Sequence, residues 1–407
     1  MKDMRVLLIT ESYPPVLGSA GRLFSELAES LKERGCRVTV LTEIPNRYMA
    51  DEGYRRRMFA RETNDGIEII RLPSFLLLRK FLPLRYLEQF LKMVEFLVAG
   101  LFMKHSKGVI IYSPPLPLAV SGILLARFYR TKAIVNIQDL YPQTPMCLGL
   151  MKNRFIIKFS QKMEKWIYEN ADFITVHSQG NKDYIVNKGI APEKIWVVAN
   201  WVDLKKYTPG FKKNQFREKF NLNGKFIVSF AGIMGFAQDM NEIINAAKIL
   251  CEYERIFFVL AGGGVGYNSL KENAEKESLK NVLFLKHLPE KEYIELLRAS
   301  DVCLVSLHKN LRTPVVPAKL QSIMAMGRPV LCSVPSTSDA RTILEEVNCG
   351  IWIEPGDAEK IVEAILSLFK SPALEEMGRR GRVYAESFFN RRKSIEMYEK
   401  ILSLDES

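Results

Sequence analysis

The chain has no closely spaced cysteine pairs, although six cysteines occur among its 407 residues. They are scattered, without a Cys-x-x-Cys motif, at positions Cys36, Cys147, Cys251, Cys303, Cys332 and Cys349. This pattern excludes zinc ribbons and thioredoxin-like redox sites. Several of the cysteines lie in apolar, strand-like runs, which is typical of buried reduced thiols.

The sequence also lacks the motifs of nucleic-acid-binding proteins. It has no aromatic RNP pattern, no zinc finger and no Arg-rich tail. Lys and Arg nevertheless number 58 against 46 for Asp and Glu, a formal net charge of +12. This surplus therefore favours anionic lipids or phosphorylated substrates as partners. Because an apolar strand follows Met1 almost at once, with no secretory signal, we expect a cytoplasmic protein.

Residues 71–107 combine basic and apolar side chains. Apolar residues from Leu87 to Leu101 follow helical spacing, but Glu88, Lys92 and Glu95 make this segment too polar to span a bilayer. Seven basic residues fall in the region, namely Arg71, Arg79, Lys80, Arg85, Lys92, Lys104 and Lys107.

The stretch 74–86 places apolar side chains directly beside Arg79 and Lys80. Such a pattern predicts contact with a membrane surface, here the cytoplasmic face of the inner membrane. The protein would then be peripheral on that membrane. An ordinary core helix preceded by an apolar loop is the alternative.

Strands and helices alternate along the chain, which predicts an α/β fold with doubly wound parallel sheets. The alternation restarts after a loop near residues 200–223, so we expect two similar Rossmann-like domains. Their predicted extents are residues 1–200 plus 388–407 and residues 201–387. The amphipathic helix Ser394–Leu404 is expected to cross back to the first domain.

In open α/β sheets, ligands bind beyond the carboxyl ends of the strands. In the first half, Gly18 lies in a loop before a helix, where the backbone can approach a diphosphate. Asp139 follows the strand Ala133–Gln138 and precedes Tyr141-Pro142, which makes it a candidate catalytic carboxylate. A turn or helix-capping role is the alternative for this aspartate.

Three loops of the second half are candidates for nucleotide binding. Gly232, with Gln238 after it, follows the first strand, and Gly263 follows the next; such glycines either bind a ligand or turn a corner. His287 and Leu288 precede the helix Glu290–Ala299, where backbone groups are placed to read a nucleobase. A structural role is the alternative for His287.

The segment Val302–Val334 runs from an apolar strand through a basic loop into a helix behind Pro317. Lys319 lies in the first turn of that helix, where the helix dipole and free N–H groups disfavour a cation. A phosphate held there by Arg312 and Lys319 would remove the conflict. A solvated lysine stem is the alternative.

Taken together, the motifs resemble those of family 4 retaining glycosyltransferases. They are YPPVLGSAGR, IQDLYPQTPMCLG, NWVD, AGIMGFAQDM and VVPAKLQSIMAMGRPV, and they occur in the family's order over nearly the full length. The bacterial surface-polysaccharide subgroup that includes N-acetyl-L-fucosamine transferases is the most similar. The resemblance implies a GT-B fold, with two facing domains and an interdomain cleft.

The resemblance further implies a nucleotide-sugar donor, with a UDP-sugar expected, gripped by the C-terminal domain. It implies an acceptor on the N-terminal domain, here a lipid-linked saccharide, and neither metal nor other cofactor. Arg312 and Lys319 would then stabilise the leaving diphosphate, and Asp139 would orient or deprotonate the acceptor hydroxyl.

The sequence departs from the family pattern at several positions. The paired glutamates that many members carry are replaced by Pro314 and Ser322, of which Ser322 still offers a hydroxyl to a ribose. Met234 and Gln238 stand near positions that more often hold Arg and Lys. A UDP-sugar 2-epimerase and a non-catalytic partner subunit of the same fold therefore remain as alternatives.

Overall fold

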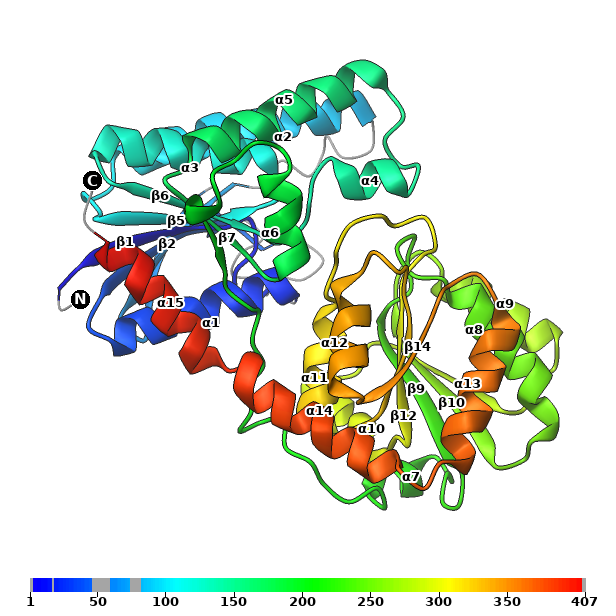
Figure 1. Cartoon of the computed structure of the whole chain (residues 1–407). Helices are drawn as coiled ribbons and strands as arrows, with labels where there is room; N and C mark the ends of the chain where they lie inside the picture. The colour runs from blue at the N-terminus through cyan, green and yellow to red at the C-terminus, as the bar shows by residue number, and fades with distance from the viewer. Residues whose placement is uncertain (1–2, 17, 46–58, 74–81, 405–407) are drawn as a thin grey trace. The chain divides into compact units, whose positions relative to one another are not determined.

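The computed structural model describes residues 3–16, 18–45, 59–73 and 82–404, and in the helix that begins at Leu82 it describes side chains from Leu87 onward. The chain forms two compact units (Figure 1). Unit 1 comprises residues 1–146, 151–200 and 392–407, and unit 2 comprises residues 147–150 and 201–391. The main division thus falls after residue 200, as expected, whereas the chain returns to unit 1 at residue 392 rather than 388.

Unit 1 is built on an eight-stranded sheet with the order β3-β4-β2-β1-β5-β6-β7-β8. All neighbouring strands pair in parallel except β3 with β4. The strands are β1 (Arg5–Ile9), β2 (Arg37–Glu43), β3 (Ala60–Asn64), β4 (Ile67–Leu72), β5 (Gly108–Ser113), β6 (Lys132–Ile137), β7 (Phe173–Val176) and β8 (Ile195–Val197).

Helices cover both faces of this sheet, and α2, α3 and α5 lie together on one of them (Figure 1). The helices are α1 (Ser19–Glu33), α2 (Leu82–Leu101), α3 (Leu116–Tyr129), α4 (Gln143–Cys147), α5 (Arg154–Asn170), α6 (Gln179–Val186), the short 3₁₀ helix η3 (Pro192–Lys194) and α15 (Arg391–Ser403). The central strands β1 and β5 are almost wholly buried and apolar, as expected for a parallel sheet covered on both sides.

The last helix, α15, completes unit 1. The Tyr398 hydroxyl, which is fully buried, accepts from Asn136 Nδ2 at 2.9 Å, and Lys132 donates to the Leu402 carbonyl at 3.3 Å. The C-terminal segment therefore packs with β6, as the sequence predicts.

Unit 2 has a six-stranded sheet with the order β11-β10-β9-β12-β13-β14, and all of its pairings are parallel. Its strands are β9 (Phe226–Ile233), β10 (Ile256–Gly263), β11 (Val282–Leu285), β12 (Val302–Ser306), β13 (Val330–Ser333) and β14 (Gly350–Ile353). Its helices are α7 (Gln215–Lys219), α8 (Met240–Ile249), η4 (Leu250–Glu252), α9 (Tyr267–Lys276), α10 (Glu290–Ala299), α11 (Ala318–Ala325), α12 (Asp339–Val347), α13 (Ala358–Lys370) and α14 (Leu374–Phe388).

The strand order explains why the carboxyl ends of β9 and β12 are the place to look for a site. These two strands are neighbours at the centre of the sheet, and the chain leaves β9 toward β10 on one side and β12 toward β13 on the other. A crevice opens where successive connections diverge in this way. Strand β12 is buried along its whole length and β9 is buried from Phe226 to Phe230, so the loops at their carboxyl ends rest on a well-packed base.

No helix among the described residues is long and apolar enough to cross a membrane. The predicted membrane-contact stretch 74–86 lies outside the described residues, apart from the backbone of the first turn of α2.

Candidate functional site

The carboxyl ends of β9 and β10 approach each other very closely in unit 2. Gly232 and Gly262 are paired across the two strands. A Cβ atom on Gly262 would lie 1.9 Å from the Gly232 carbonyl oxygen, and the two residues have φ angles of +145° and +149°. Only glycine adopts this conformation without strain and without a clash. These two positions therefore fix the backbone that forms the floor of the candidate site.

Lys319 lies directly against this floor. A Cβ atom on Gly232 would fall 2.2 Å from Lys319 Cε and 2.6 Å from its Nζ. The same Nζ lies 3.7 Å from the centroid of the Phe230 ring, in β9. The missing side chain at Gly232 thus makes room for the lysine, whose ammonium rests on an aromatic face.

The charge of Lys319 has no acidic counterpart among the described residues. Its side chain is half-buried and forms no ion pair in the described part of the chain. Burial lowers the pKa of the Lys319 ammonium to about 7. Because Lys319 also occupies the first turn of α11, at the positive end of that helix, an anion bound here would relieve the electrostatic cost.

Hydrogen bonds tie the end of β12 and the loop after it to the loop after β9. His308 N donates to the Ala237 carbonyl at 2.8 Å, and Asp239 N donates to Ser306 Oγ at 3.2 Å. Arg312 belongs to this loop, and its side chain is exposed. The structure therefore places Arg312 on the loop that leads into α11, with its guanidinium free to reach toward solvent.

Gln238 and Met234 follow Gly232, and their hydrogen bonds are made to neighbouring backbone groups. Gln238 Oε1 accepts from Gly235 N at 3.2 Å, while Met234 is fully buried and its N–H donates to the Gly263 carbonyl at 2.7 Å. Gly263, in contrast, faces open space, since no heavy atom lies within 4 Å of the position that its Cβ would take. Gly263 is thus the glycine of the unit 2 site that has room beside it for a ligand, whereas Gly232 does not.

Ser322, His287 and Leu288 are placed less directly for ligand contact. Ser322 Oγ donates to the Lys319 carbonyl at 2.9 Å and lies 2.7 Å from the Tyr293 hydroxyl, which therefore donates to it. Its hydrogen atom is thus committed within the protein, and its suggested ribose contact stays a prediction. His287 is exposed, and Leu288 is half-buried against the cluster of apolar side chains around α10.

In unit 1, Asp139 follows β6 at the carboxyl end of the sheet. Its side chain keeps access to solvent, yet the surrounding protein raises the pKa of its carboxyl to about 6 by desolvation. The next residue, Leu140, is buried and anchors the loop. Gly18 caps α1 at the same end of the sheet, with φ +145° and no heavy atom within 4 Å of a would-be Cβ.

Tyr112 and Glu11 are two neighbours of Asp139 that the sequence did not single out as site residues. Burial raises the pKa of the Tyr112 hydroxyl, and the nearby Asp139 and Glu11 carboxylates raise it further. All three residues lie at strand ends, after or within β6, β5 and β1. Their position at the carboxyl ends of the strands is the signal in the sequence that could have identified them.

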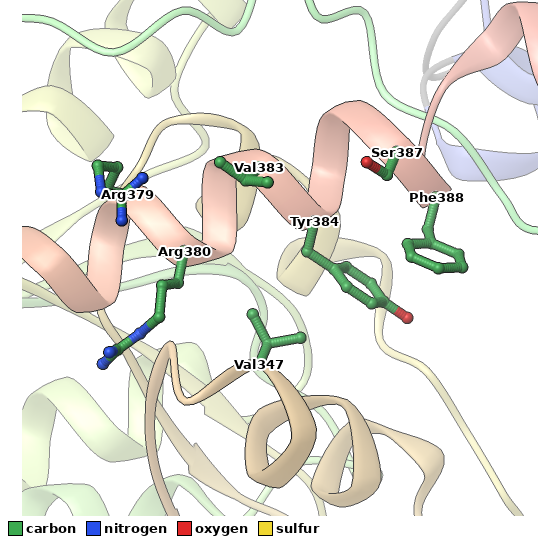
Figure 2. Close-up of a pocket in the computed structure, with 7 residues that line it drawn as sticks. All are labelled: Val347, Arg379, Arg380, Val383, Tyr384, Ser387 and Phe388. Atoms are coloured by element: carbon green, nitrogen blue, oxygen red, sulfur yellow. The ribbon is translucent and has the colours of Figure 1, made fainter.

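A shallow hollow of about 330 Å³ lies elsewhere on unit 2, between α12 and α14 (Figure 2). Val347, at the end of α12, and Tyr384 in α14 are among its lining residues. Val347 precedes the start of β14, so this hollow lies at the amino ends of the strands, whereas Lys319 lies at their carboxyl ends. It contains none of the predicted site residues.

Each half of the chain matches a family model. Residues 18–201 match the model described as "Glycosyl transferase 4-like domain", and residues 212–384 match "Glycosyl transferases group 1". The chain is a GT-B glycosyltransferase. The site around Lys319 therefore belongs to the group 1 half of this enzyme, and Asp139 to the 4-like half.

Two curated relatives and one solved structure illustrate the similarity. A protein named as a colanic acid biosynthesis glycosyl transferase, WcaI, of Escherichia coli (strain K12) is 23% identical over 97% of this chain and 98% of its own. The UDP-Gal:alpha-D-GlcNAc-diphosphoundecaprenol alpha-1,3-galactosyltransferase of Escherichia coli is 26% identical over 55% of this chain and 57% of its own. Sucrose-phosphate synthase from Thermosynechococcus elongatus has the same fold, with a TM-score of 0.75, 16% identity and 98% coverage of both chains.

The described residues of this glycosyltransferase hold no group of three or more His, Cys, Asp or Glu side chains arranged to bind a metal ion. Among the described residues, Lys319, Arg312 and the backbone N–H groups at the start of α11 are the groups placed to interact with an anion.

Proposed function

We propose that this enzyme is a retaining glycosyltransferase that works without a metal ion. It would transfer a sugar, an N-acetylated or deoxy hexose, from a UDP-sugar to a polyprenyl-diphosphate-linked saccharide. The product would be an intermediate of surface polysaccharide or glycan biosynthesis. Unit 2 would hold the donor and unit 1 the acceptor.

The observation that carries this proposal is the uncompensated ammonium of Lys319. It lies at the start of α11, against the glycine backbone of β9 and on the Phe230 ring. A diphosphate bound here would meet the ammonium, the free N–H groups of the helix and the nearby glycine backbone together. Open space at Gly263, where β10 ends, leaves room for the rest of the donor.

The proposed reaction breaks the bond between the anomeric carbon and the diphosphate oxygen, and the electron pair leaves with the UDP. The acceptor hydroxyl oxygen forms the new bond on the same face of the sugar, so the anomeric configuration is retained. Its proton passes to the departing diphosphate or to the Asp139 carboxylate. As negative charge grows on the diphosphate, Lys319 and Arg312 stabilise it, which lowers the barrier.

The choice of donor and acceptor class draws on the relative whose name includes a UDP-sugar and a diphosphoundecaprenol-linked saccharide. The suggestion of surface polysaccharide biosynthesis draws on the relative named for colanic acid. Both are properties of those proteins, and for this chain they are hypotheses.

Incubation with a panel of UDP-sugars and polyprenyl-diphosphate-linked saccharides, with EDTA present, tests the proposal. We expect UDP release that requires both substrates and survives EDTA, and a product whose new linkage has the donor's anomeric configuration by NMR. Activity that is lost with EDTA would refute the metal-free mechanism. Consumption of the donor without an acceptor would favour the epimerase alternative. UDP binding without any turnover would favour the non-catalytic partner subunit.

A further inference from the structure

Helix α2 has an exposed apolar stripe on its outer side, whereas two of its charged side chains, Glu88 and Lys92, face inward, as the buried Phe96 does. Glu88 is fully buried and Lys92 is 3% exposed, one turn apart on the inner face. The outer stripe is apolar, at exposures from 39% to 50%, and comprises Leu87, Phe90, Leu91, Val94, Val98 and Leu101. A helix on the surface of a water-soluble domain normally has the opposite arrangement.

Ion pairs with residues at the carboxyl ends of two strands hold the helix in this orientation. Lys92 Nζ lies 2.6 Å from a Glu43 carboxylate oxygen, 2.8 Å from Glu11 and 3.2 Å from Glu88. Glu43 ends β2 and Glu11 follows β1, so both partners are fixed by the sheet. Turning the helix to bury its apolar stripe would break the ion pairs of Lys92 with Glu43, Glu11 and Glu88.

The apolar surface continues onto the neighbouring helix α5. Phe155 and Phe159 of α5 are 85% and 51% exposed, and the rings of Phe90 and Phe159 lie 6.1 Å apart. We call the six apolar residues of α2 together with Phe155 and Phe159 the α2–α5 face. Contiguous exposed apolar surfaces of this kind mark contacts with membranes or with other proteins.

Basic side chains flank this face. Lys158 and Lys162 lie on the same side of α5 as the two phenylalanines by helical spacing, and both are exposed. Lys104 and Lys107 follow the end of α2 and are also exposed. Of the two acidic residues of α2, Glu88 is buried with Lys92, and Glu95 is half-buried with its pKa raised to about 7 by burial. The surroundings are therefore complementary to negative charge.

We propose that the α2–α5 face rests on the surface of an anionic lipid bilayer. Apolar side chains would enter the boundary between head groups and acyl chains, while Lys158 and Lys162 meet lipid phosphates. This inference deepens the proposed function, on which it rests for the lipid-linked acceptor. It adds described residues of α2 and α5 to the membrane contact predicted for residues 74–86, whose side chains lie outside the described part of the chain. It also corrects the interpretation of Lys92 and Arg71 as part of a basic surface, because both are buried in ion pairs.

The opposite sides of α2 would then link the membrane to the acceptor end of unit 1. The outer stripe would contact lipid, and the inner Lys92 forms an ion pair with Glu11. The Glu11 and Asp139 carboxylates both raise the pKa of the Tyr112 hydroxyl, which places the three groups close together. A polyprenyl-linked acceptor held in the same bilayer would thus be presented at the edge of the sheet where Asp139 lies.

Sedimentation with lipid vesicles tests this proposal without donor or acceptor. We expect the full chain to pellet with vesicles that contain phosphatidylglycerol and to stay in the supernatant with phosphatidylcholine alone. The triple variant Leu91→Gln, Val94→Gln, Val98→Gln should lose the pelleted fraction. The control Ile249→Gln, Val265→Gln, Val383→Gln changes three residues of unit 2 with exposures of 47%, 72% and 51% and should pellet like the wild type.

A second variant, Lys158→Glu with Lys162→Glu, leaves the apolar face intact. It should weaken binding about fivefold or more per residue, the equivalent of ~1 kcal/mol for each basic residue near an anionic surface. Unchanged circular dichroism and UDP binding show that each variant is folded, and they separate this test from that of the proposed function.

Several outcomes would overturn the proposal. One is that the two triple variants pellet equally. Another is that Leu77→Ser, Leu78→Ser, Phe81→Ser, outside the described residues, releases the protein while the α2 triple does not. A third is that the wild-type protein does not bind vesicles and is a dimer, whereas the α2 triple variant is a monomer. That result would assign the face to contact with a second copy of the chain.

Discussion

The ammonium of Lys319 lies 3.7 Å from the centroid of the Phe230 ring, in the space that glycine leaves at position 232. Two residues of β9 and the first turn of α11, which lie far apart in the sequence, are needed to build this arrangement. An aromatic face stabilises a cation by roughly 0.5–2 kcal/mol, which offsets only part of its desolvation. Lys319 is therefore prepared to bind an anion.

The lowered pKa of Lys319 predicts proton uptake when a nucleoside diphosphate binds. With a pKa of about 7, a substantial share of the lysine is neutral at and above neutral pH in the free protein. A bound diphosphate stabilises the ammonium and raises its pKa, so UDP affinity should fall as pH rises through about 7. Calorimetry in buffers of different ionisation enthalpy measures the uptake directly. A binding enthalpy that is the same in every buffer would contradict this account.

The same lowered pKa fixes the sign of a stability effect. The pKa of Lys319 is about 7 in the folded state and has the ordinary value of 10.5 in the unfolded state. Between about pH 7 and pH 10.5 the unfolded state therefore binds more protons than the folded state. Its contribution to stability should therefore rise with pH across this window. The difference in denaturation midpoint between wild type and Lys319→Met, followed against pH, gives the sign, and a difference that moves the other way would exclude the desolvated lysine.

Two glycines provide a matched pair of substitutions. Gly232→Ala places a methyl group against Lys319 at a φ of +149°, so it should lower stability by about 1–3 kcal/mol and weaken UDP binding. Gly263→Ala meets nothing within 4 Å, so its thermal midpoint should stay near that of the wild type, while a donor at this point would lose affinity. Thermal unfolding with and without UDP measures both. Normal UDP affinity in Gly263→Ala would remove this residue from the donor site.

Asp139→Asn should reduce turnover about 10²- to 10⁴-fold, the usual effect of losing an acid–base group. UDP affinity should not change, because the residue belongs to unit 1. With a carboxyl pKa of about 6, wild-type turnover should decline as pH falls below that value and the carboxylate takes up a proton. Steady-state rates against pH for both proteins make the comparison. If the variant matched the wild type, Asp139 would have no catalytic role.

Lys92 supports the inverted orientation of α2. Lys92→Met should lower the free energy of unfolding by about 3–5 kcal/mol, because it removes one partner of the buried ion pairs with Glu43 and Glu88. Lys165→Met is the control, since Lys165 and its partner Glu169 are exposed and such a pair contributes less than about 1 kcal/mol. Urea denaturation of the two variants tests the difference, and equal midpoints would mean that the buried cluster does not hold the helix.

The general architecture and part of the unit 2 site could be predicted from the sequence. The strands beginning at Arg5, Phe226 and Ile256 were found because parallel strands are continuous apolar runs. Gly232 and Lys319 were found because glycines at strand ends and a cation in a first helical turn are locally unusual. The structure adds that these two residues are in contact.

Other features depend on tertiary context. The short strands β7, β8 and β14 have three or four residues and carry little pattern of their own. Helix α3 begins at Leu116, directly before Pro117, because proline is accepted in a first helical turn. The apolar stripe of α2 was visible, but its outward orientation follows from Lys92 pairing with Glu11, 81 positions away.

The most direct test of the central claim is a metal-free calorimetric titration of UDP into the wild type and into Lys319→Ala. Loss of a charge-assisted hydrogen bond of about 1.5–3 kcal/mol predicts an affinity that is about 10- to 150-fold weaker in the variant. Equal affinities for the two proteins, or no UDP binding by the wild type, would contradict the assignment of Lys319 to the diphosphate of the donor.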